Sequence, residues 1–279
     1  MKLVKTVNDL QKELQQLRMT GTVGFVPTMG ALHKGHISLV EKAAKENPVV
    51  VVSIFVNPTQ FNDPKDLERY PRDLEADLKR LEKSDITLVF APSVEEMYPE
   101  NDTRKFDFGM LETVMEGEHR PGHFNGVAQV VSKLFGMVKP DKAYFGIKDF
   151  QQVAIIKNMT EQLNLTVEIV ACPIIREKSG LAMSSRNELL SSEERKNAAV
   201  ISETLLKAKQ LVGQKSVKEL TEWVIENINK NPYLSVEYVE IVDDKKLQPV
   251  GNWEEENRIV GCVAVFCGKV RLIDNIVLN

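Results

Sequence analysis

The stretch VVVVSIFV at residues 49–56 is apolar except for Ser53, and it lies between Pro48 and the polar turn NPTQ. A membrane-spanning helix needs about 20 apolar residues, so this run is far too short to cross a bilayer. Such a run is typical of a β-strand buried on both faces, as strands of parallel sheets are. Short apolar runs also occur at 22–26, 86–90, 142–146 and 166–171. We expect these five segments to be strands.

Helical patterns separate these strands, which is the arrangement of βαβ units. One helix is predicted from the spacing of Val127, Val130, Val131, Leu134 and Val138, and another from Leu74, Leu78 and Leu81, which follow Pro71. Near residue 185 the pattern changes. Two helical stretches at 191–213 and 216–230 precede strands at 235–243, 258–267 and 270–278 that no helix separates.

The predicted fold class is therefore α/β, with two domains. Residues 1–184 are expected to form a Rossmann-like domain around a parallel sheet. Residues 185–279 are expected to form a smaller α+β domain with an antiparallel sheet.

Charge and cysteine content limit the function classes. The net charge is −4 and the pI is near 5.8, with basic and acidic residues interspersed, so no nucleic-acid partner is expected. Cys172, Cys262 and Cys267 form no CxxC pair, which favours buried thiols in a reducing compartment over a disulfide framework. We expect a cytoplasmic protein that is neither exported nor embedded in a membrane.

The motifs with chemical potential follow predicted strands. PTMGALHKGH follows 22–26, NPTQF follows 49–56, FGIKDFQQ follows 142–146 and REKSGLAMSSR follows 166–171. Ligands of open parallel sheets bind beyond the carboxyl ends of the strands, where loops meet helix N-termini. These four segments are therefore the candidate site.

The segment PTMGALHKGH comes close to the phosphate-binding pattern GxxxxGK[ST]. His36 stands where that pattern needs lysine and Ile37 where it needs a hydroxyl, which argues against a P-loop kinase. A strand, a glycine-bearing loop and a helix still suit phosphate, and the imidazoles of His33 and His36 can donate hydrogen bonds to its oxygens. The alternatives are two loop histidines without a role, or a metal site completed by His119 and His123 through the fold.

The segment REKSGLAMSSR offers hydroxyls, backbone N–H groups and the cations Lys178 and Arg186, which suit a triphosphate. A structural alternative is strong. Ser185 with Glu188, and Ser191 with Glu194, both match the capping-box pattern of a helix start.

The other two segments carry weaker signals. Lys148 and Asp149 stand at an expected helix start, where a cation is unfavourable unless an anion such as phosphate lies beside it. With Gln152 one turn on, they could also be a plain charged first turn. The amides of Asn57 and Gln60, in the turn after 49–56, can bind a small substrate with hydroxyls and a carboxylate. As plain turn residues they would be unremarkable.

Together these segments resemble the adenylylating nucleotidyltransferases that carry an HxGH element. The fuller set PTMGALHKGH, FVNPTQF, HFNGVAQVV, FGIKDFQQ and GLAMSSRN resembles the pantothenate synthetase (pantoate:beta-alanine ligase) family over essentially the whole chain. The resemblance implies that ATP activates pantoate as pantoyl adenylate, with release of pyrophosphate. The amine of beta-alanine then displaces AMP to give pantothenate.

The resemblance also implies roles for particular residues. The residues expected to act in catalysis are His33, His36, Lys148, Ser184, Ser185 and Arg186. The residues expected to bind ATP are Met29, Gly30, Ala31, Leu32, His33, Lys34, Gly35, His36, Gly146, Ile147, Lys148, Asp149, Ile175, Met183, Ser184, Ser185 and Arg186. The residues expected to bind pantoate or beta-alanine are Met29, Asn57, Gln60 and Gln152. Mg²⁺ is expected to bridge the phosphates with help from Asp77, and Arg120 is a weaker candidate for that site. The family further implies a homodimer.

Two other classes of function share parts of this pattern. A nucleotidyltransferase that makes a dinucleotide shares the histidine element but gives no reason for the paired glutamines. A nucleotide-binding module without enzymatic activity would bind ATP and release no pyrophosphate.

Overall fold

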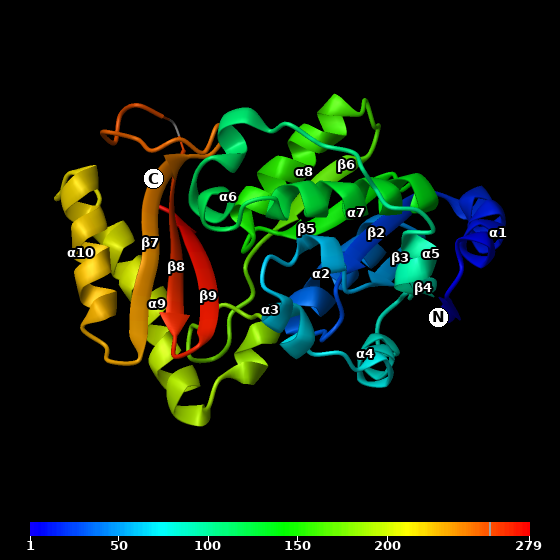
Figure 1. Cartoon of the computed structure of the whole chain (residues 1–279), viewed down its shortest axis with the longest axis horizontal. Coiled ribbons are helices and arrows are strands. Elements are labelled where there is room, and N and C mark those ends of the chain that lie inside the picture. Colours follow the sequence, from blue (N-terminus) through cyan, green and yellow to red (C-terminus); the bar gives the residue numbers. More distant parts are fainter. Residues whose placement is uncertain (257) are drawn as a thin grey trace. The chain divides into compact units, whose positions relative to one another are not determined.

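The computed structural model describes residues 1–256 and 258–279 (Figure 1). The chain packs into two compact units that interleave along the sequence. Unit 1 comprises Met1–Phe108, Arg120–Ile147 and Gln152–Pro173, and unit 2 comprises Gly109–His119, Lys148–Gln151 and Ile174–Asn279. The division into folding domains at 184/185 stays a prediction, because packing units that interleave do not test it.

Unit 1 contains a six-stranded sheet in the order β1-β4-β3-β2-β5-β6, and every pair of neighbouring strands is parallel. The strands are β1 (Lys2–Val4), β2 (Val23–Thr28), β3 (Val49–Ile54), β4 (Leu88–Phe90), β5 (Lys142–Gly146) and β6 (Glu168–Cys172). The predicted Rossmann-like sheet is therefore confirmed, with all five predicted strands in it.

The prediction missed β1. This strand has three residues, two of them exposed, and it pairs with β4 at the edge of the sheet. So short an edge strand has almost no hydrophobic pattern to detect. The four candidate segments consequently follow β2, β3, β5 and β6.

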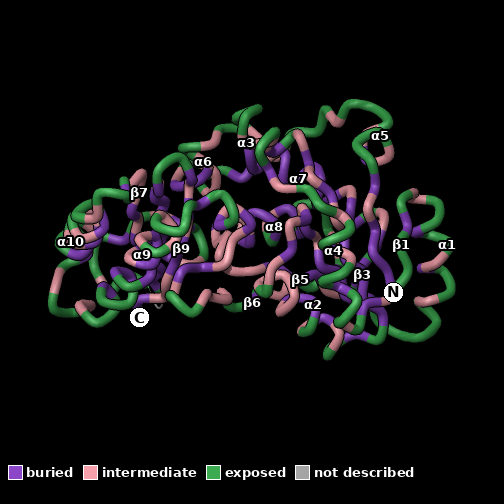
Figure 2. Tube along the Cα trace, turned by 90° about the horizontal axis from the view of Figure 1, so that it is seen from below, coloured by how far each residue is buried: buried purple, intermediate pink, exposed green. Residues whose placement is uncertain are grey.

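Helices cover both faces of this sheet, because successive side chains of a strand point to opposite faces. Val26 and Val52 pack on one face in a cluster that includes Val40 of α2 (Lys34–Glu46). Phe25 and Phe145 lie on the other face, where both rings contact Phe135 of α7 (His123–Val138). Figure 2 shows the result, with the inner strand β3 largely purple and green segments along helices and loops.

The remaining helices include those that the sequence predicts from its apolar spacing. They are α1 (Val7–Leu17), α3 (Pro64–Arg69), α4 (Leu74–Leu81), α5 (Val94–Met97), α6 (Met115–His119), α8 (Phe150–Gln162), α9 (Ser192–Gln210) and α10 (Val217–Asn229), with 3₁₀ turns η1 (Arg18–Thr20), η2 (Pro58–Gln60), η3 (Gly109–Glu112) and η4 (Ser185–Leu189). The helices predicted from residues 74–81 and 127–138 correspond to α4 and α7. Ser191 and Glu194 form the predicted capping box of α9.

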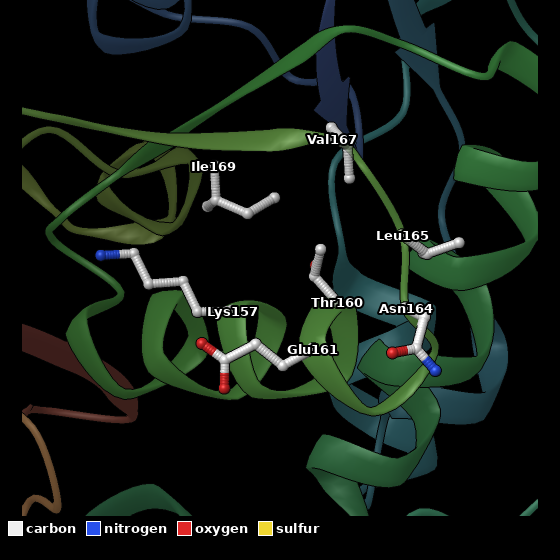
Figure 3. Close-up of a pocket in the computed structure, with 7 residues that line it drawn as sticks. All are labelled: Lys157, Thr160, Glu161, Asn164, Leu165, Val167 and Ile169. Carbon is white, nitrogen blue, oxygen red and sulfur yellow. The ribbon is translucent and has the colours of Figure 1, made fainter.

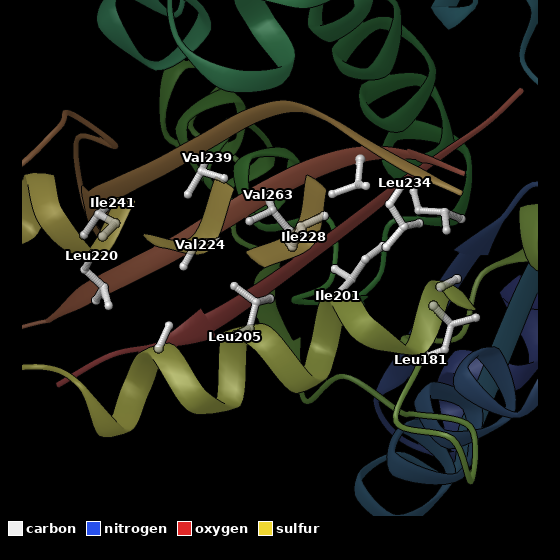
Figure 4. Close-up of a cluster of buried hydrophobic side chains, with 14 of the residues drawn as sticks. Leu181, Ile201, Leu205, Leu220, Val224, Ile228, Leu234, Val239, Ile241 and Val263 are labelled. Carbon is white, nitrogen blue, oxygen red and sulfur yellow. The ribbon is translucent and has the colours of Figure 1, made fainter. Parts of the chain in front are cut away.

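Unit 2 contains the predicted antiparallel sheet, formed by β7 (Leu234–Asp243), β8 (Ile259–Cys267) and β9 (Val270–Val277) in that order. Figure 4 shows the apolar side chains of α9 and α10 packed against one face of it. Ile201 and Leu205 of α9 and Val263 of β8 belong to that cluster. The smaller α+β part is confirmed.

Two further expectations concern the whole chain. All three cysteine thiols are free and buried, as predicted. Within residues 1–256 and 258–279, every helix is too short or too polar to traverse a bilayer.

Candidate functional site

The strand order of unit 1 places the candidate segments on four neighbouring strands. β3, β2, β5 and β6 are consecutive in the sheet, and each is followed by one of the motifs. The order also reverses between β2 and β5, and in open parallel sheets ligands bind at such a switch point, beyond the carboxyl ends. The loop after β2 therefore stands at the favoured position for a ligand.

The two histidines of that loop are the N-terminal cap of α2. His33 is the N-cap residue, and its Nδ1 accepts a hydrogen bond from the N–H of Gly35 at 3.1 Å. His36 is the third helical residue, and its Nδ1 accepts from the N–H of His33 at 3.2 Å. The two rings lie 4.0 Å apart between centroids. This reciprocal capping explains the spacing of three and was not foreseen from the sequence, although a capping box has that same spacing.

The capping bonds also fix how each ring holds its proton. A ring nitrogen that accepts from a backbone N–H cannot carry a proton, so the neutral form of each histidine is protonated on Nε2. Each imidazole therefore offers an Nε2–H donor at a helix N-terminus, where the unpaired N–H groups and the helix dipole attract anions.

The backbone before the helix is held in an unusual conformation. Gly30 has φ +79° and Ala31 has φ +48°, both in the left-handed region. A Cβ on Gly30 would lie 2.9 Å from Oδ2 of Asp77. Asp77, on α4, accepts the N–H of Ala31 at 3.0 Å and that of Leu32 at 2.7 Å. The carboxylate therefore fixes the turn that delivers the histidines.

These contacts bear on the predicted magnesium site. Asp77 is 3% exposed, and each of its oxygens accepts a backbone N–H. Burial raises the pKa of its carboxyl above the ordinary value, against the effect of the hydrogen bonds from Leu32 and Ala31. Among the described residues no group of three or more acidic, histidine or cysteine side chains is arranged to hold a metal ion. A magnesium ion held mainly by protein ligands does not fit this site. An ion bound to the phosphate oxygens of ATP would need few protein ligands.

The amides after β3 form a compact buried group. Gln60 Nε2 lies 3.0 Å from the sulfur of Met29, and its Oε1 accepts from Nδ2 of Asn57 at 3.3 Å. Asn57 is 1% exposed, and its Oδ1 accepts from the hydroxyl of Tyr98 at 2.9 Å. The structure thus brings together three of the four residues predicted to bind substrate, and Asn57 fixes the position of Gln60.

The start of α7 supports this group from behind. Asn57 Nδ2 donates to the carbonyl of Gly126 at 3.1 Å, and a Cβ on Gly126 would lie 2.5 Å from the carbonyl oxygen of Thr59. Nδ1 of His123 lies 2.8 Å from the carbonyl oxygen of Gln60, and Nε2 of His123 lies 3.2 Å from Arg120. The block HFNGVAQVV therefore has a structural reason to accompany NPTQF.

Two adjacent glutamines open α8 with different surroundings. Gln151 is buried, donates to the carbonyls of Leu111 and Val114, and accepts the N–H of Glu116. Gln152, the predicted substrate residue, is half-buried. Its role in substrate binding stays a prediction.

The segment after β5 carries Lys148 in unit 2. Its ammonium pairs with Oδ1 of Asp149 at 3.1 Å, and its carbonyl accepts from Nδ2 of Asn275 on β9 at 3.0 Å. Gly146 ends β5, and the N–H of Ile147 donates to the carbonyl of Cys172 in unit 1. Both contacts hold the main chain of the predicted ATP-binding segment.

The segment after β6 forms a short hairpin followed by η4, and we call residues 175–186 the serine loop. The N–H of Met183 donates to the carbonyl of Ile175 at 2.9 Å, and Arg176 pairs with Ala182 in an antiparallel bridge. Ser184 is the N-cap of η4 and accepts the N–H of Arg186 at 3.3 Å. The capping residue is therefore Ser184, and the predicted capping box between Ser185 and Glu188 is wrong because Ser185 lies inside η4.

The alternative metal site with His119 and His123 finds no support among the described residues. The ring of His119 stacks on Tyr238, and that of His123 contacts the carbonyl of Gln60.

A shallow pocket of about 640 Å³ lies between α8 and β6 (Figure 3). Its lining includes Lys157, Glu161 and Ile169 and no residue predicted to act on substrate or ATP.

Comparison with known proteins identifies the family of the chain. A family model described as Pantoate-beta-alanine ligase matches residues 2–277. Pantothenate synthetase of Bacteroides fragilis (strain YCH46) is 58% identical over 277 residues, which cover 99% of this chain and 98% of that protein. The crystal structure of pantothenate synthetase from Thermus thermophilus is 46% identical with a TM-score of 0.94, covering 100% of this chain and 99% of that one.

A second solved structure carries ligands. Pantoate-beta-alanine ligase from Francisella tularensis, complexed with beta-gamma ATP and beta-alanine, is 38% identical with a TM-score of 0.84, covering 100% of this chain and 98% of that one. The family model, the relative and the two solved structures each match nearly the whole length of this chain. The chain therefore belongs to the pantoate-beta-alanine ligase family.

Proposed function

We propose that this protein joins pantoate to beta-alanine at the expense of ATP, through a pantoyl adenylate, and so makes pantothenate, a precursor of coenzyme A. The family membership over the full length supports the reaction. The observation that carries the proposal is the capped histidine pair at the start of α2, which places two Nε2–H donors at a helix N-terminus.

The first step activates a poor acyl donor. A pantoate carboxylate oxygen attacks the α-phosphorus of ATP, and the bond from that phosphorus to the bridging oxygen of pyrophosphate breaks. Negative charge grows on the phosphate oxygens as this bond lengthens. The Nε2–H groups of His33 and His36 are preorganised by the capping bonds, so they can stabilise that charge without reorienting.

The second step forms the amide. The free amine of beta-alanine attacks the acyl carbon, AMP leaves with the electron pair of the acyl–oxygen bond, and the amine loses one proton to solvent. Met29, Asn57, Gln60 and Gln152 are proposed to bind the substrates. The buried contact between Gln60 and Asn57 favours this role, because it holds the Gln60 amide in one orientation.

Further residues are proposed to bind ATP. In the loop after β2, which we call the histidine loop (residues 29–36), they are Met29 to His36. After β5 they are Gly146, Ile147, Lys148 and Asp149. The serine loop contributes Ile175, Met183, Ser184, Ser185 and Arg186. Arg186 and Lys148 supply positive charge, and the serines supply hydroxyls, which is the chemistry that a triphosphate requires.

Three finer proposals accompany this function. Mg²⁺ would bind with ATP, where phosphate oxygens hold it and it neutralises their charge. Asp77 would then act by holding the histidine loop, and the Arg120 cation by contacting phosphate, neither as a ligand of the ion. The protein is proposed to act as a homodimer and in the cytoplasm, and the buried free thiols are compatible with a reducing compartment.

The test supplies the purified protein with ATP, Mg²⁺ and pantoate, with and without beta-alanine, and follows pyrophosphate, AMP and pantothenate. We expect pantothenate, AMP and pyrophosphate in equal amounts when all substrates are present. If pyrophosphate release does not depend on pantoate but increases when a mononucleotide is added, the protein would instead be a dinucleotide-forming enzyme. ATP binding without any product would indicate a binding module.

A further inference from the structure

Two neighbouring residues of β9, Asp274 and Asn275, hold two different segments of unit 2 that carry predicted ATP-binding residues. Asp274 contacts Arg176 in the serine loop, and Asn275 contacts the main chain of Lys148. Both residues are buried, each 4% exposed. Neither residue belongs to one of the sequence motifs described above.

Asp274 closes the serine loop with a two-pronged ion pair. Nη1 of Arg176 lies 2.6 Å from Oδ2 of Asp274, and Nη2 lies 3.0 Å from Oδ1. The same Nη1 donates to the carbonyl of Gly180 at 3.1 Å. Paired parallel hydrogen bonds of this kind fix direction as well as distance. Arg176 therefore ties the tip of the hairpin to β9.

The hairpin in turn sets where the serines begin. Gly180 has φ +93°, and a Cβ there would lie 2.8 Å from Oγ of Ser202 on α9, so the turn sits close against that helix. Glu177, beside Arg176, accepts two hydrogen bonds from Arg195 of α9, at 3.0 and 2.8 Å. Anchored at both points, the strand returning through Ala182 delivers Met183 and Ser184 at a fixed place.

Asn275 acts on the other side of the strand. Consecutive strand residues point to opposite faces. Asp274 stands opposite Val263, whose side chain belongs to the core under α9, and Asn275 stands opposite Cys262. The N–H of Asn275 donates to Oδ1 of Asp274 at 2.8 Å, so one carboxylate oxygen meets both Arg176 and the backbone of Asn275. One point on β9 therefore supports both segments.

We propose that Asp274 and Asn275 are positioning residues for the adenylation step: they hold the serine loop and the Lys148 segment in the arrangement that binds the reacting phosphates of ATP. This inference rests on the proposed function and adds two residues to it. Its consequence is selective, because the second half-reaction no longer involves a triphosphate.

The test compares Asn275→Ala and Arg176→Lys with a matched control. Arg176→Lys keeps the positive charge but removes the paired hydrogen bonds to Asp274 and the hydrogen bond to the carbonyl of Gly180. The control is Asp243→Asn, because Asp243 is a buried aspartate at the end of β7 that accepts the N–H groups of Lys245, Lys246 and Gln248 in a turn without predicted site residues. Three quantities are measured: pantoate-dependent exchange of pyrophosphate into ATP, amide formation from supplied pantoyl adenylate and beta-alanine, and thermal unfolding.

We expect exchange to fall roughly 10- to 100-fold in both variants, the scale of a misplaced catalytic segment, with amide formation as in the wild type. Exchange equal to that of Asp243→Asn would overturn the inference. So would equal loss of both half-reactions in step with lower unfolding temperature. If Asn275→Ala does not fold, Arg176→Lys decides by the same criteria. A wild-type protein that makes no pantothenate would instead refute the proposed function.

Discussion

The histidine loop and the serine loop are both proposed to bind ATP phosphates, but the chain holds them by different means. The imidazoles of the first are fixed by backbone N–H groups two and three residues away. The second is fixed by side-chain ion pairs. One of them joins Arg176 to Asp274, which is 98 positions away in the sequence. A local cap orients the imidazoles, and Asp77 on α4 holds the turn before them, whereas the serine loop depends on the sheet of unit 2.

This difference has a consequence for substitutions. In the histidine loop, one side chain caps a helix and is also proposed to contact the phosphates, so a single change should affect stability and rate together. In the serine loop, Arg176 and Glu177 anchor the hairpin through side chains that are not proposed to touch ATP. In the serine loop, substituting an anchoring residue should therefore disturb the position of the loop and leave the ATP-binding side chains intact. In the histidine loop the two effects can be separated only by replacing one histidine with different residues.

The largest effect is expected for His36→Ala. If its donor meets charge that develops only as the α-phosphate is attacked, adenylate formation should slow by roughly 10²- to 10³-fold, the usual loss for one preorganised donor. ATP affinity should fall much less. Single-turnover formation of pantoyl adenylate beside equilibrium ATP binding measures the two effects.

His36→Gln separates capping from chemistry. Glutamine is a normal residue at the third position of a capping box, so it can accept the N–H of His33 and retain the stability that Ala loses, about 1 kcal/mol. The rate should stay low. Recovery of the rate with Gln would show that helix capping, and not the imidazole, was the contribution of His36.

A smaller effect is expected at Gln60, which is proposed to bind pantoate and not phosphate. Gln60→Ala should weaken pantoate binding by about 1 to 3 kcal/mol, because the buried substrate groups lose their partner. ATP binding should hardly change. Gln129→Ala is the matched control, since this buried glutamine of unit 1 donates to the carbonyls of Asp102 and Arg104. Lower ATP affinity with normal pantoate affinity would assign Gln60 to the nucleotide.

Asp77 provides the long-range support of the histidine loop, and its removal should act on stability. Asp77→Ala leaves the buried N–H of Leu32 without its acceptor, which should cost about 1 to 3 kcal/mol in unfolding free energy. Chemical denaturation of the two proteins at several pH values measures it.

The pH dependence of this difference has a definite sign. Burial raises the pKa of Asp77 in the folded state, so its contribution to stability is fully present below the ordinary pKa of about 3.9 and is lost as pH rises through the raised value. The stability gap between wild type and Asp77→Ala should therefore narrow as pH rises through that interval. A gap that widens would show a lowered pKa.

The sequence predicted those features whose causes are local. The parallel sheet followed from apolar runs such as VVVVSIFV, and the candidate site followed from loops after strands. The edge strand β1 was missed because three residues carry no periodicity. The capping role of the histidines was missed because histidine is not a usual capping residue, although the spacing was visible.

Other features depend on pairs that are distant in the chain. Nothing near Asp77 shows that it will accept the N–H groups of Ala31 and Leu32, 46 and 45 positions away. Arg176 and Lys178 are equally basic in sequence, and only the fold shows that Arg176 meets Asp274. Buried polar contacts of this kind arise from topology, and no local pattern encodes them.

The measurement that tests the central claim most directly is the exchange of labelled pyrophosphate into ATP without beta-alanine. If the histidine and serine loops serve adenylation as a separate first step, exchange must occur with pantoate alone and must cease when pantoate is omitted. We expect His36→Ala to abolish most of this exchange and to bind ATP nearly as the wild type does. Exchange that strictly requires beta-alanine would contradict a free pantoyl adenylate and the division of the reaction on which this account depends.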